Sequence, residues 1–247
     1  MPDRANRRTR VRNRGPPITV DVNGGSSPGR PIPGGFLVVF EGIGGSGKST
    51  LARRLGERLE AAGWAVRMTR EPGGTELGSA IRAILLGKGQ APDPWAEAFL
   101  FEADRALTYA EVLKPSLEAG AIVVSDRGPF GTVAYQGYGR ALDLSLIDAM
   151  SETAWRGLKA DLVFVLDVEP RVGLARKRGS QEHDRFDQED LDFQSRAREG
   201  YLFSAKRRGA NTFVLDGALP PDEGFGQVWG ATVERLDARL AARGTGE

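Results

Sequence analysis

The stretch FLVVFEGIGGSGKSTLARRL, which spans Phe36 to Leu55, passes from a solid apolar block through several glycines to a lysine and two hydroxyl residues. Residues 42–49 fit the pattern G-x-x-x-x-G-K-[ST], which binds phosphate where it follows a strand and opens a helix. The glycines let backbone N–H groups approach phosphate oxygens, and the helix N-terminus adds a favourable field. Because FLVVF predicts the strand and leucines every four residues from Leu51 predict the helix, this stretch predicts a nucleotide-binding loop.

Each residue of this loop has an expected part in the binding of ATP. Lys48 supplies a positive charge for the β- and γ-phosphates, and the Ser49 hydroxyl supplies a ligand for Mg²⁺. The loop therefore predicts a site for ATP with Mg²⁺ as the cofactor. The expected ATP-binding residues of the loop are Gly42, Gly44, Gly45, Ser46, Gly47, Lys48, Ser49 and Thr50.

Short apolar runs recur along the rest of the chain, at residues 64–70, 121–126, 162–168 and 211–217. Runs of this length, rich in Val, Leu and Phe and without polar alternation, are typical of strands that are buried on both faces. Parallel strands need helical crossovers, and the segments between the runs supply them. We therefore predict an α/β fold with a three-layer, doubly wound parallel sheet, in which ligands gather at the carboxyl ends of the strands.

Composition limits what else the chain can contain. Residues 1–35 are rich in Arg, Gly, Pro and Ser, so we expect a disordered basic tail before one domain over residues 36–247. The 34 Lys and Arg nearly balance the 33 Asp and Glu, so the total charge indicates no partner. The absence of cysteine excludes disulfides and cysteine nucleophiles. No apolar run approaches the length of a bilayer span, so we expect a cytoplasmic protein without a membrane partner.

A phosphate-binding loop does not specify the reaction, because motors, GTPases, transporters and small-molecule kinases share it. Three further segments indicate a second ligand. Residues 70–75, REPGGT, end the second predicted strand, and Asp126 and Arg127 end the third. Phe101 and Arg105 are four residues apart and share one face of a predicted helix. The strand ends face the phosphate loop, which predicts an acceptor opposite ATP.

Together these segments resemble the thymidylate kinase family, whose members phosphorylate dTMP. The resemblance runs from about Phe36 to the C-terminus and rests on FEGIGGSGKST, TREPGGTELG, FLFEADR, SDRGPFGTVAYQGYGR and the arginine-rich LARKRGSQEHDRF. It implies the P-loop nucleoside monophosphate kinase fold and transfer of the γ-phosphate of ATP to a pyrimidine deoxynucleoside monophosphate, with dTMP giving dTDP. It also implies a homodimer.

The resemblance assigns roles to individual residues. Arg70 and Arg127 would bind the acceptor phosphate, and Phe101 would stack on the pyrimidine. A lid at about residues 176–188 would close over ATP, and its arginines would supply the transition-state charge that an arginine in the loop provides elsewhere; here Gly45 has that loop position. The implied acceptor site consists of Arg70, Phe101, Arg105, Arg127, Thr132 and Tyr135, the lid contributes Arg176, Arg178 and Arg185, and the implied catalytic residues are Lys48, Asp126, Arg127 and Arg185.

The chain departs from the family pattern at three glycines. Gly44, Gly128 and Gly131 replace a carboxylate, an aromatic or histidine, and a serine, which predicts a roomier and less polar acceptor pocket. The first hypothesis keeps dTMP as the acceptor. The second is a relative that acts on a modified or different nucleoside monophosphate. The third is a P-loop ATPase or regulator whose residues 1–35 bind nucleic acid by counterion release; it leaves Phe101, Arg105 and the lid unexplained, so we expect no nucleic-acid partner.

Overall fold

The computed structural model describes residues 27, 29–87, 89, 91–179 and 184–244. Residues 1–26, which belong to the expected disordered tail, lie outside this description. Within the described residues, five strands form one sheet, and their bounds fall within two residues of the predicted runs. In spatial order they are β2 (Val66–Arg70), β3 (Ile122–Asp126), β1 (Phe36–Glu41), β4 (Leu162–Asp167) and β5 (Thr212–Asp216).

All neighbouring strands in the sheet are parallel, and β1 lies at its centre. Because parallel strands share one direction, their carboxyl ends meet at the same edge, where ligands of doubly wound sheets bind. In this register Phe40, Asp126 and Arg70 lie across the sheet from one another, at the ends of β1, β3 and β2. The predicted three-layer α/β fold is therefore confirmed.

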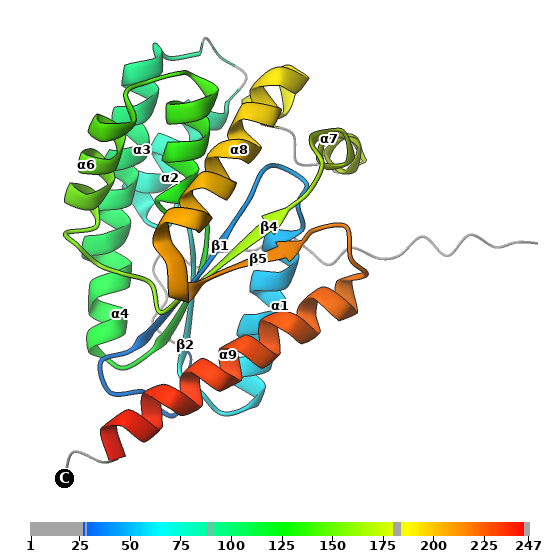
Figure 1. The fold of residues 1–247 in the computed structure, drawn as a ribbon. Helices are drawn as coiled ribbons and strands as arrows, with labels where there is room; N and C mark the ends of the chain where they lie inside the picture. Colours follow the sequence, from blue (N-terminus) through cyan, green and yellow to red (C-terminus); the bar gives the residue numbers. More distant parts are fainter. Residues whose placement is uncertain (1–26, 28, 88, 90, 180–183, 245–247) are drawn as a thin grey trace, which may run out of the picture.

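Helices cover both faces of the sheet (Figure 1). Alternate side chains of β1 point to opposite faces, as strand geometry requires. Phe40 packs in the core formed with α1 (Lys48–Ala61) and α9 (Pro221–Gly244). Val39 packs in the core on the other face, to which α8 (Leu191–Arg208) contributes.

The remaining helices have clear boundaries. They are α2 (Glu76–Leu86), α3 (Pro94–Thr108), α4 (Lys114–Glu118), α5 (Phe130–Thr132), α6 (Leu144–Ala154) and α7 (Pro170–Arg178), with the π-helical segments η1 (Tyr109–Leu113) and η2 (Val133–Gly139) and the 3₁₀ turns η3 (Arg185–Gln188) and η4 (Gly209–Asn211). Thr75 and Asp93 accept hydrogen bonds from backbone N–H groups and cap α2 and α3. Among the described helices, none is both long enough and apolar enough to cross a membrane.

The packed part of the chain begins before Phe36, where the domain was expected to start. Ile32 is fully buried in the core beneath α1. Arg30 forms an isolated parallel bridge with Trp64, and its guanidinium lies 4.3 Å from the centroid of the Trp64 ring. The buried Ile32 side chain adds apolar contact area to the core. Residues 29–35 therefore belong to the folded domain, which the sequence pattern did not reveal.

Replacing Ile32 by alanine is expected to lower the free energy of unfolding by about 2–5 kcal/mol, because the cavity is left in a close-packed core. Urea denaturation of the full chain measures this change. Val214 on β5 is 51% exposed, so Val214→Ala is the matched control and is expected to cost about 1 kcal/mol or less. Equal effects of the two substitutions would contradict the anchoring role of Ile32.

Candidate active site

The phosphate loop joins β1 to α1 and uses backbone conformations that favour glycine. Gly42, Gly45 and Gly47 have φ angles of 137°, 73° and 97°. A side chain at Gly45 would also collide with the backbone of Gly173. The loop leads directly into the N-terminus of α1, where the helix dipole favours anions. The predicted context of strand, glycine-rich turn and helix is therefore confirmed.

Lys48 begins α1 and is largely buried, with 7% of its surface exposed. Its Nζ donates a hydrogen bond to the backbone oxygen of Ile43 at 3.3 Å, so the amine lies back over the loop. Burial, followed by the charge of Arg127, lowers the pKa of Lys48 to about 7, and Asp126 opposes this change. An anionic ligand at the loop would favour the protonated amine and raise the pKa of Lys48 toward its ordinary value.

The residues beside the loop fit a divalent cation that is bound together with ATP. Ser49 Oγ donates a hydrogen bond to Asp126 Oδ2 at 2.5 Å. The other carboxylate oxygen, Asp126 Oδ1, is buried and accepts no hydrogen bond from the described part of the chain. Oxygen ligands are those that Mg²⁺ prefers. The described residues contain no group of three or more His, Cys, Asp or Glu side chains that could hold a metal, so such an ion would depend on ligands from the nucleotide.

Arg127 is directed at the phosphate loop by an unusual backbone conformation. Its φ angle is 82°, in a region that residues other than glycine rarely adopt. Its Nη1 donates hydrogen bonds to the Tyr201 hydroxyl at 2.7 Å and to the backbone oxygen of Gly42 at 3.2 Å. The guanidinium also lies 5.4 Å from the centroid of the Tyr135 ring. Strained residues that persist at a cleft are commonly part of its function.

Three arginines converge near the carboxyl ends of β2 and β3. Arg82 on α2 donates a hydrogen bond to the backbone oxygen of Pro72 at 2.9 Å. Burial lowers the pKa of Arg82, and the charges of Arg70 and Arg127 lower it further, because like charges repel. An anion placed between these three side chains would relieve the repulsion. The cluster therefore favours an anionic ligand opposite the phosphate loop, and a guanidinium fork suits a phosphate group.

Aromatic rings lie beside this arginine cluster. The rings of Phe101 on α3 and Phe186 on η3 have centroids 6.0 Å apart, and those of Phe186 and Tyr135 are 5.1 Å apart. Burial raises the pKa of the Tyr135 hydroxyl, and the nearby charge of Arg127 opposes this increase. An aromatic wall of this kind can hold a flat base by stacking. Phe101 and Tyr135 were predicted to line the acceptor site, and the structure brings them together with Phe186.

Arg105 lies in a buried polar network. It is 2% exposed, donates hydrogen bonds to Glu71 and Thr132, both at 2.8 Å, and is ion-paired with Glu102. Burial opposes the charge, but Glu102 and Glu71 outweigh it and raise the pKa of Arg105 above its usual value. Arg105 and Thr132, both expected in the acceptor site, are therefore hydrogen-bonded to each other. Arg105 thereby joins α3 to the loop after β2 and to α5, whose last residue is Thr132.

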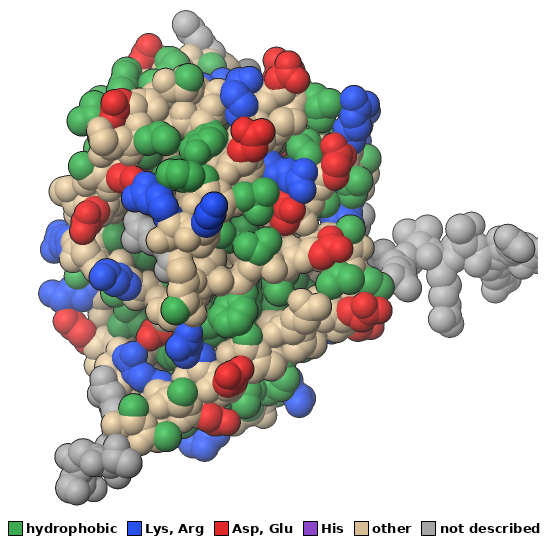
Figure 2. Space-filling view, in the orientation of Figure 1, with side chains coloured by type: hydrophobic (Ala, Val, Ile, Leu, Met, Phe, Trp, Pro, Cys, Tyr) green, Lys and Arg blue, Asp and Glu red, His purple; other side chains and the backbone are tan. Residues whose placement is uncertain are grey.

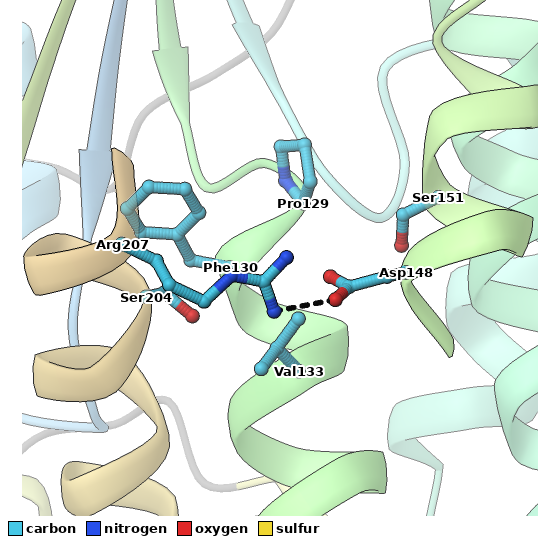
Figure 3. A pocket seen from close by; sticks show the side chains of 7 residues that line it. All are labelled: Pro129, Phe130, Val133, Asp148, Ser151, Ser204 and Arg207. Carbon is cyan, nitrogen blue, oxygen red and sulfur yellow. Dashed lines mark hydrogen bonds and ion pairs between the residues drawn. The ribbon is translucent and has the colours of Figure 1, made fainter. Parts of the chain in front are cut away.

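A crevice lies behind this network, between η2, α6 and α8 (Figure 3). Its wall consists of Pro129, Phe130, Val133, Asp148, Ser151, Ser204 and Arg207. An ion pair of 2.6 Å between Arg207 and Asp148 joins α8 to α6 at this crevice. The hydroxyl of Ser151 donates to Glu102 at 2.7 Å, so the crevice ends at the Arg105 network. It supports the outer side of the network and does not belong to the aromatic pocket.

Comparison with known proteins assigns the chain to a family. The family model for thymidylate kinase matches residues 40–225. The thymidylate kinase of Solidesulfovibrio magneticus is 46% identical over 209 residues, which cover 81% of this chain and 100% of that relative. The chain belongs to the thymidylate kinase family. A second family member, the thymidylate kinase of Deinococcus radiodurans, is 41% identical over 201 residues and is covered to 98%.

A solved thymidylate kinase structure agrees with this assignment. The crystal structure from Ehrlichia chaffeensis has a TM-score of 0.68 and 32% sequence identity, over 81% of this chain and 99% of the other. The predicted resemblance and the predicted nucleoside monophosphate kinase fold are therefore confirmed. The matched region contains the phosphate loop, the arginine cluster and the aromatic pocket.

The arginines that were expected in a lid of this thymidylate kinase family member lie in different places. Arg176 on α7 donates hydrogen bonds to the backbone oxygens of Gly217 at 2.7 Å and Gly45 at 3.3 Å. Arg178, two residues further on, is exposed. The structure therefore brings Arg176, but not Arg178, into contact with the phosphate loop.

Arg185 is directed away from that loop. Its Nε donates to the backbone oxygen of Leu85 at 3.1 Å, and its Nη2 lies 2.7 Å from the carboxylate of the fully buried Glu97. Arg140 is ion-paired with the same carboxylate at 3.3 Å. Arg185 thus joins η3 to α2 and α3, and its Nη2 can contact ATP only if it leaves Glu97.

The roomier pocket expected from the family glycines is not present at Gly128. A Cβ atom at this position would lie 3.0 Å from Val39 and 3.3 Å from both Glu41 and Trp155. Core side chains thus fill the space beside Gly128. The expectation of a roomier pocket is wrong at this position, because these buried neighbours pack against the glycine. At Gly131 the nearest atom to such a Cβ would be the Tyr201 hydroxyl at 3.6 Å, an ordinary contact distance.

Sequence reasoning missed three residues of the site: Arg82, Phe186 and Tyr201. Arg82 and Tyr201 lie in the interiors of α2 and α8, where a charged or aromatic residue has many structural explanations. Phe186 follows Arg185 in the expected lid, where the neighbouring arginines predict contacts to phosphate and give no sign of an aromatic pocket. The helical spacing could not have identified them, because their relation to Arg127 and Phe101 depends on how the helices pack.

Proposed function

We propose that this protein transfers the γ-phosphate of ATP to dTMP and releases ADP and dTDP. The observation that carries the proposal is the position of the phosphate loop opposite the cluster of Arg70, Arg82 and Arg127, with the aromatic pocket beside it. Two adjacent anion-binding sites, with a stacking surface beside the second, suit two nucleotides that exchange a phosphoryl group. Membership of the thymidylate kinase family supports dTMP as the acceptor.

In the proposed reaction, an oxygen of the acceptor phosphate attacks the γ-phosphorus in line, and the bond from that phosphorus to the ADP oxygen breaks. The two nucleotides carry like charges, so the protein must hold them together against repulsion. Lys48 and Arg127 neutralise charge on the transferring group, and Arg70 holds the acceptor. No general base is needed, because the acceptor phosphate is largely deprotonated at neutral pH.

The remaining predicted site residues would lie around the two nucleotides. Ser49 and Asp126 would hold Mg²⁺, which supplies further charge neutralisation to the phosphates when it is bound. Arg176 and Arg185 would approach the transferring group as the lid closes, and Arg178 would contact ATP from outside. The base would stack on Phe101, with Tyr135 beneath the sugar.

The direct test is ADP release from MgATP in a coupled assay, at equal concentrations of dTMP, dUMP, UMP, dCMP, CMP, dGMP and a 5-substituted pyrimidine deoxynucleoside monophosphate. The highest kcat/KM is expected for dTMP. A poor rate with dTMP and a fast rate with another acceptor would replace the proposal by the second hypothesis, a family member with a different acceptor. ADP release that is independent of every acceptor would indicate an ATPase.

The nucleic-acid hypothesis has little support on the face seen in Figure 2. Lysine and arginine side chains alternate there with aspartate and glutamate and form no continuous basic stripe. Several surface arginines are neutralised locally; Arg53, Arg207 and Arg239 each form an ion pair. A cytoplasmic location, expected from the composition, stays a prediction.

We propose a homodimer through α2 and α3, as the family resemblance predicted. Large apolar side chains are exposed on this surface: Leu77 and Ile84 on α2 are each 58% exposed, and Phe99 on α3 is 59% exposed. Trp95 lies against Phe99, with ring centroids 6.2 Å apart. Exposed apolar clusters of this kind mark protein interfaces. The surface belongs to the two helices that carry Phe101 and Arg82, so dimerisation would support both ligand-binding helices.

Phe99→Asp is expected to convert a dimer to a monomer at micromolar concentration, because it places a charge in an apolar interface. Light scattering after size exclusion measures the mass. Val214→Asp, on an exposed position of β5, is the matched control and is expected to leave the mass unchanged. A wild-type chain that is monomeric at 50 µM would refute the proposed dimer.

A further inference from the structure

Helix α7 contacts the phosphate loop directly through its backbone (Figure 1). A Cβ atom on Gly45 of the loop would lie 2.1 Å from the backbone oxygen of Gly173, which is buried in α7. In return, a Cβ atom on Gly173 would lie 2.6 Å from the backbone oxygen of Gly44. Both distances are shorter than real Cβ atoms adopt. The loop and the helix can therefore approach this closely only because both contact positions are glycines.

The contact, and not the conformation of the helix, accounts for glycine at residue 173. Gly173 lies inside α7 and is not among the residues with a positive φ. A helix interior ordinarily favours alanine over glycine, because glycine loses more conformational freedom on folding. Ile43 and Val168, both buried, lie 3.5 and 3.6 Å from the same Cβ position. An alanine there would consequently push α7 and the loop apart.

Arg176 lies one turn further along α7, on the same face as Gly173, because residues three apart in a helix are neighbours. Its Nη1 donates hydrogen bonds to the backbone oxygens of Gly45 at 3.3 Å and of Gly217, which follows β5, at 2.7 Å. Gly217 also approaches the loop, since a Cβ atom on it would lie 3.2 Å from the backbone oxygen of Ser46. The position of the Arg176 guanidinium at the loop thus depends on how closely α7 approaches.

We propose that Gly173 is a positioning residue, whose contact with the phosphate loop holds the guanidinium of Arg176 at the phosphates of ATP. The proposal rests on the proposed function, because it assumes ATP on the loop and a phosphoryl group in transfer. A cation stabilises such a group only where it is directed at the charge that develops, and a displacement of about 1 Å can cost about 10²-fold in rate. A displaced α7 would carry Arg176 away from the loop, although the arginine itself is unchanged.

The test replaces Gly173 by alanine in the full chain and measures steady-state kinetics with MgATP and dTMP. We expect kcat to fall by about 10²-fold, the scale of a misplaced catalytic group, and the KM for dTMP to stay within about threefold. Wild-type kcat in Gly173→Ala would overturn the proposal. An equal rise in the KM values for ATP and dTMP would indicate general damage to the fold and would overturn it as well.

Gly230→Ala is the matched control, because it makes the same substitution inside a helix without a contact. Gly230 is an exposed residue of α9, and outside its own helix backbone no atom of the described chain lies within 4 Å of a Cβ at this position. The control is expected to keep kcat within about twofold and to raise the urea concentration at the midpoint of unfolding. Failure of Gly173→Ala to fold, measured by circular dichroism, would make Gly173 a residue of the fold and would overturn its positioning role.

A double-mutant cycle separates positioning from packing. Arg176→Met removes the guanidinium and leaves the glycine contact in place, so kcat is expected to fall by about 10²-fold or more. If Gly173 acts through Arg176, the double variant is expected to lie within about threefold of Arg176→Met, because coupled residues are not additive. Losses that multiply in full would show that Gly173 acts independently of Arg176, which would contradict the proposal. Wild-type kcat in Arg176→Met would contradict it too, whether or not Gly173→Ala folds.

The failure of this inference is distinguishable from failure of the proposed function. A wild-type protein that phosphorylates dTMP, together with a fully active Gly173→Ala variant, retains the function and loses only the role of Gly173. A wild-type protein that is fast with another monophosphate loses dTMP as its acceptor. The same variants then test Gly173 with that monophosphate, because the contact lies on the ATP side of the site. A wild-type protein that transfers phosphate to no acceptor overturns both.

Discussion

Replacing Lys48 by methionine is expected to lower kcat for dTMP phosphorylation by about 10³-fold, the scale of removing one preorganised charge from a transferring group. Lys48 begins α1 directly after the glycines of the loop, and its amine lies within the loop at 3.3 Å from the backbone oxygen of Ile43. Methionine has a similar length, so the substitution removes the charge and little of the packing. Steady-state kinetics with saturating MgATP and dTMP measure the effect.

The same variant is expected to be more stable than the wild-type protein without ligands. Burial, followed by the charge of Arg127, lowers the pKa of Lys48 to about 7 from the ordinary value of 10.5 that applies to the unfolded chain. Because the folded pKa is depressed, the wild-type protein loses stability as the pH falls from 10.5 toward 7, and this loss is complete below pH 7. The methionine variant lacks this loss, so its advantage in the free energy of unfolding is expected to grow as the pH falls through this window.

These two readouts separate a catalytic effect from a folding defect. Lys114 is a matched control, because its side chain is 52% exposed and lies 3.9 Å from Glu118 in a surface ion pair. Lys114→Met is expected to change kcat by less than about twofold and stability by less than about 0.5 kcal/mol. Full activity of Lys48→Met would refute the mechanism, and a less stable variant at pH 7 would contradict the buried charge.

Replacing Arg127 by alanine is expected to lower kcat/KM for dTMP by about 10³-fold or more, within the range of arginines that act on a transferring phosphoryl group. Arg127 contacts both Gly42 of the phosphate loop and Tyr201, and it belongs to the arginine cluster of the proposed acceptor site. In the proposed reaction it is the arginine between the two anionic ligands. Its loss is therefore expected to affect kcat as well as the KM for dTMP.

Arg127→Lys tests whether charge alone suffices. Lysine keeps the charge but cannot donate the parallel hydrogen bonds of a guanidinium, so kcat/KM is still expected to fall by about 10²-fold. Arg156 is the matched control, since it is an exposed arginine that also has a positive φ angle, of 49°. Arg156→Ala is expected to leave kcat/KM within twofold. A lysine variant of Arg127 with wild-type kinetics would show that geometry at this position is unimportant.

Arg185 and Arg176, both expected in the lid, have different partners in the structure. Arg185 is ion-paired with Glu97, whose carboxylate also receives Arg140 and the amide of Gln136 at 2.7 Å. Glu97 is fully buried, so removing Arg185 from this carboxylate leaves a charge that Arg140 alone must balance. If Arg185 supplies transition-state charge through its Nη2, ATP has to compete with Glu97 for that nitrogen. Arg176 already contacts the phosphate loop and needs no such exchange.

Much of the fold was predictable because it depends on local patterns. The apolar runs without alternation identified all five strands, since strands buried on both faces need apolar residues at every position. The leucines at four-residue intervals identified the buried face of α1, and Leu51, Leu55 and Leu59 are all buried. The packing of Ile32 ahead of Phe36 was not predictable, because one isoleucine in a segment of Gly, Pro and Arg carries no periodic signal.

The sequence by itself determined the phosphate loop and its ligand class, because glycines, lysine and serine act there through adjacent backbone and need no distant partner. It also determined which strand ends carry Arg70 and Arg127. Only the tertiary structure decided that Arg105 is enclosed by Glu71 and Glu102 and that Gly173 lies against Gly45. These relations join residues far apart in the chain, and they depend on how helices pack on the sheet, which local spacing cannot specify.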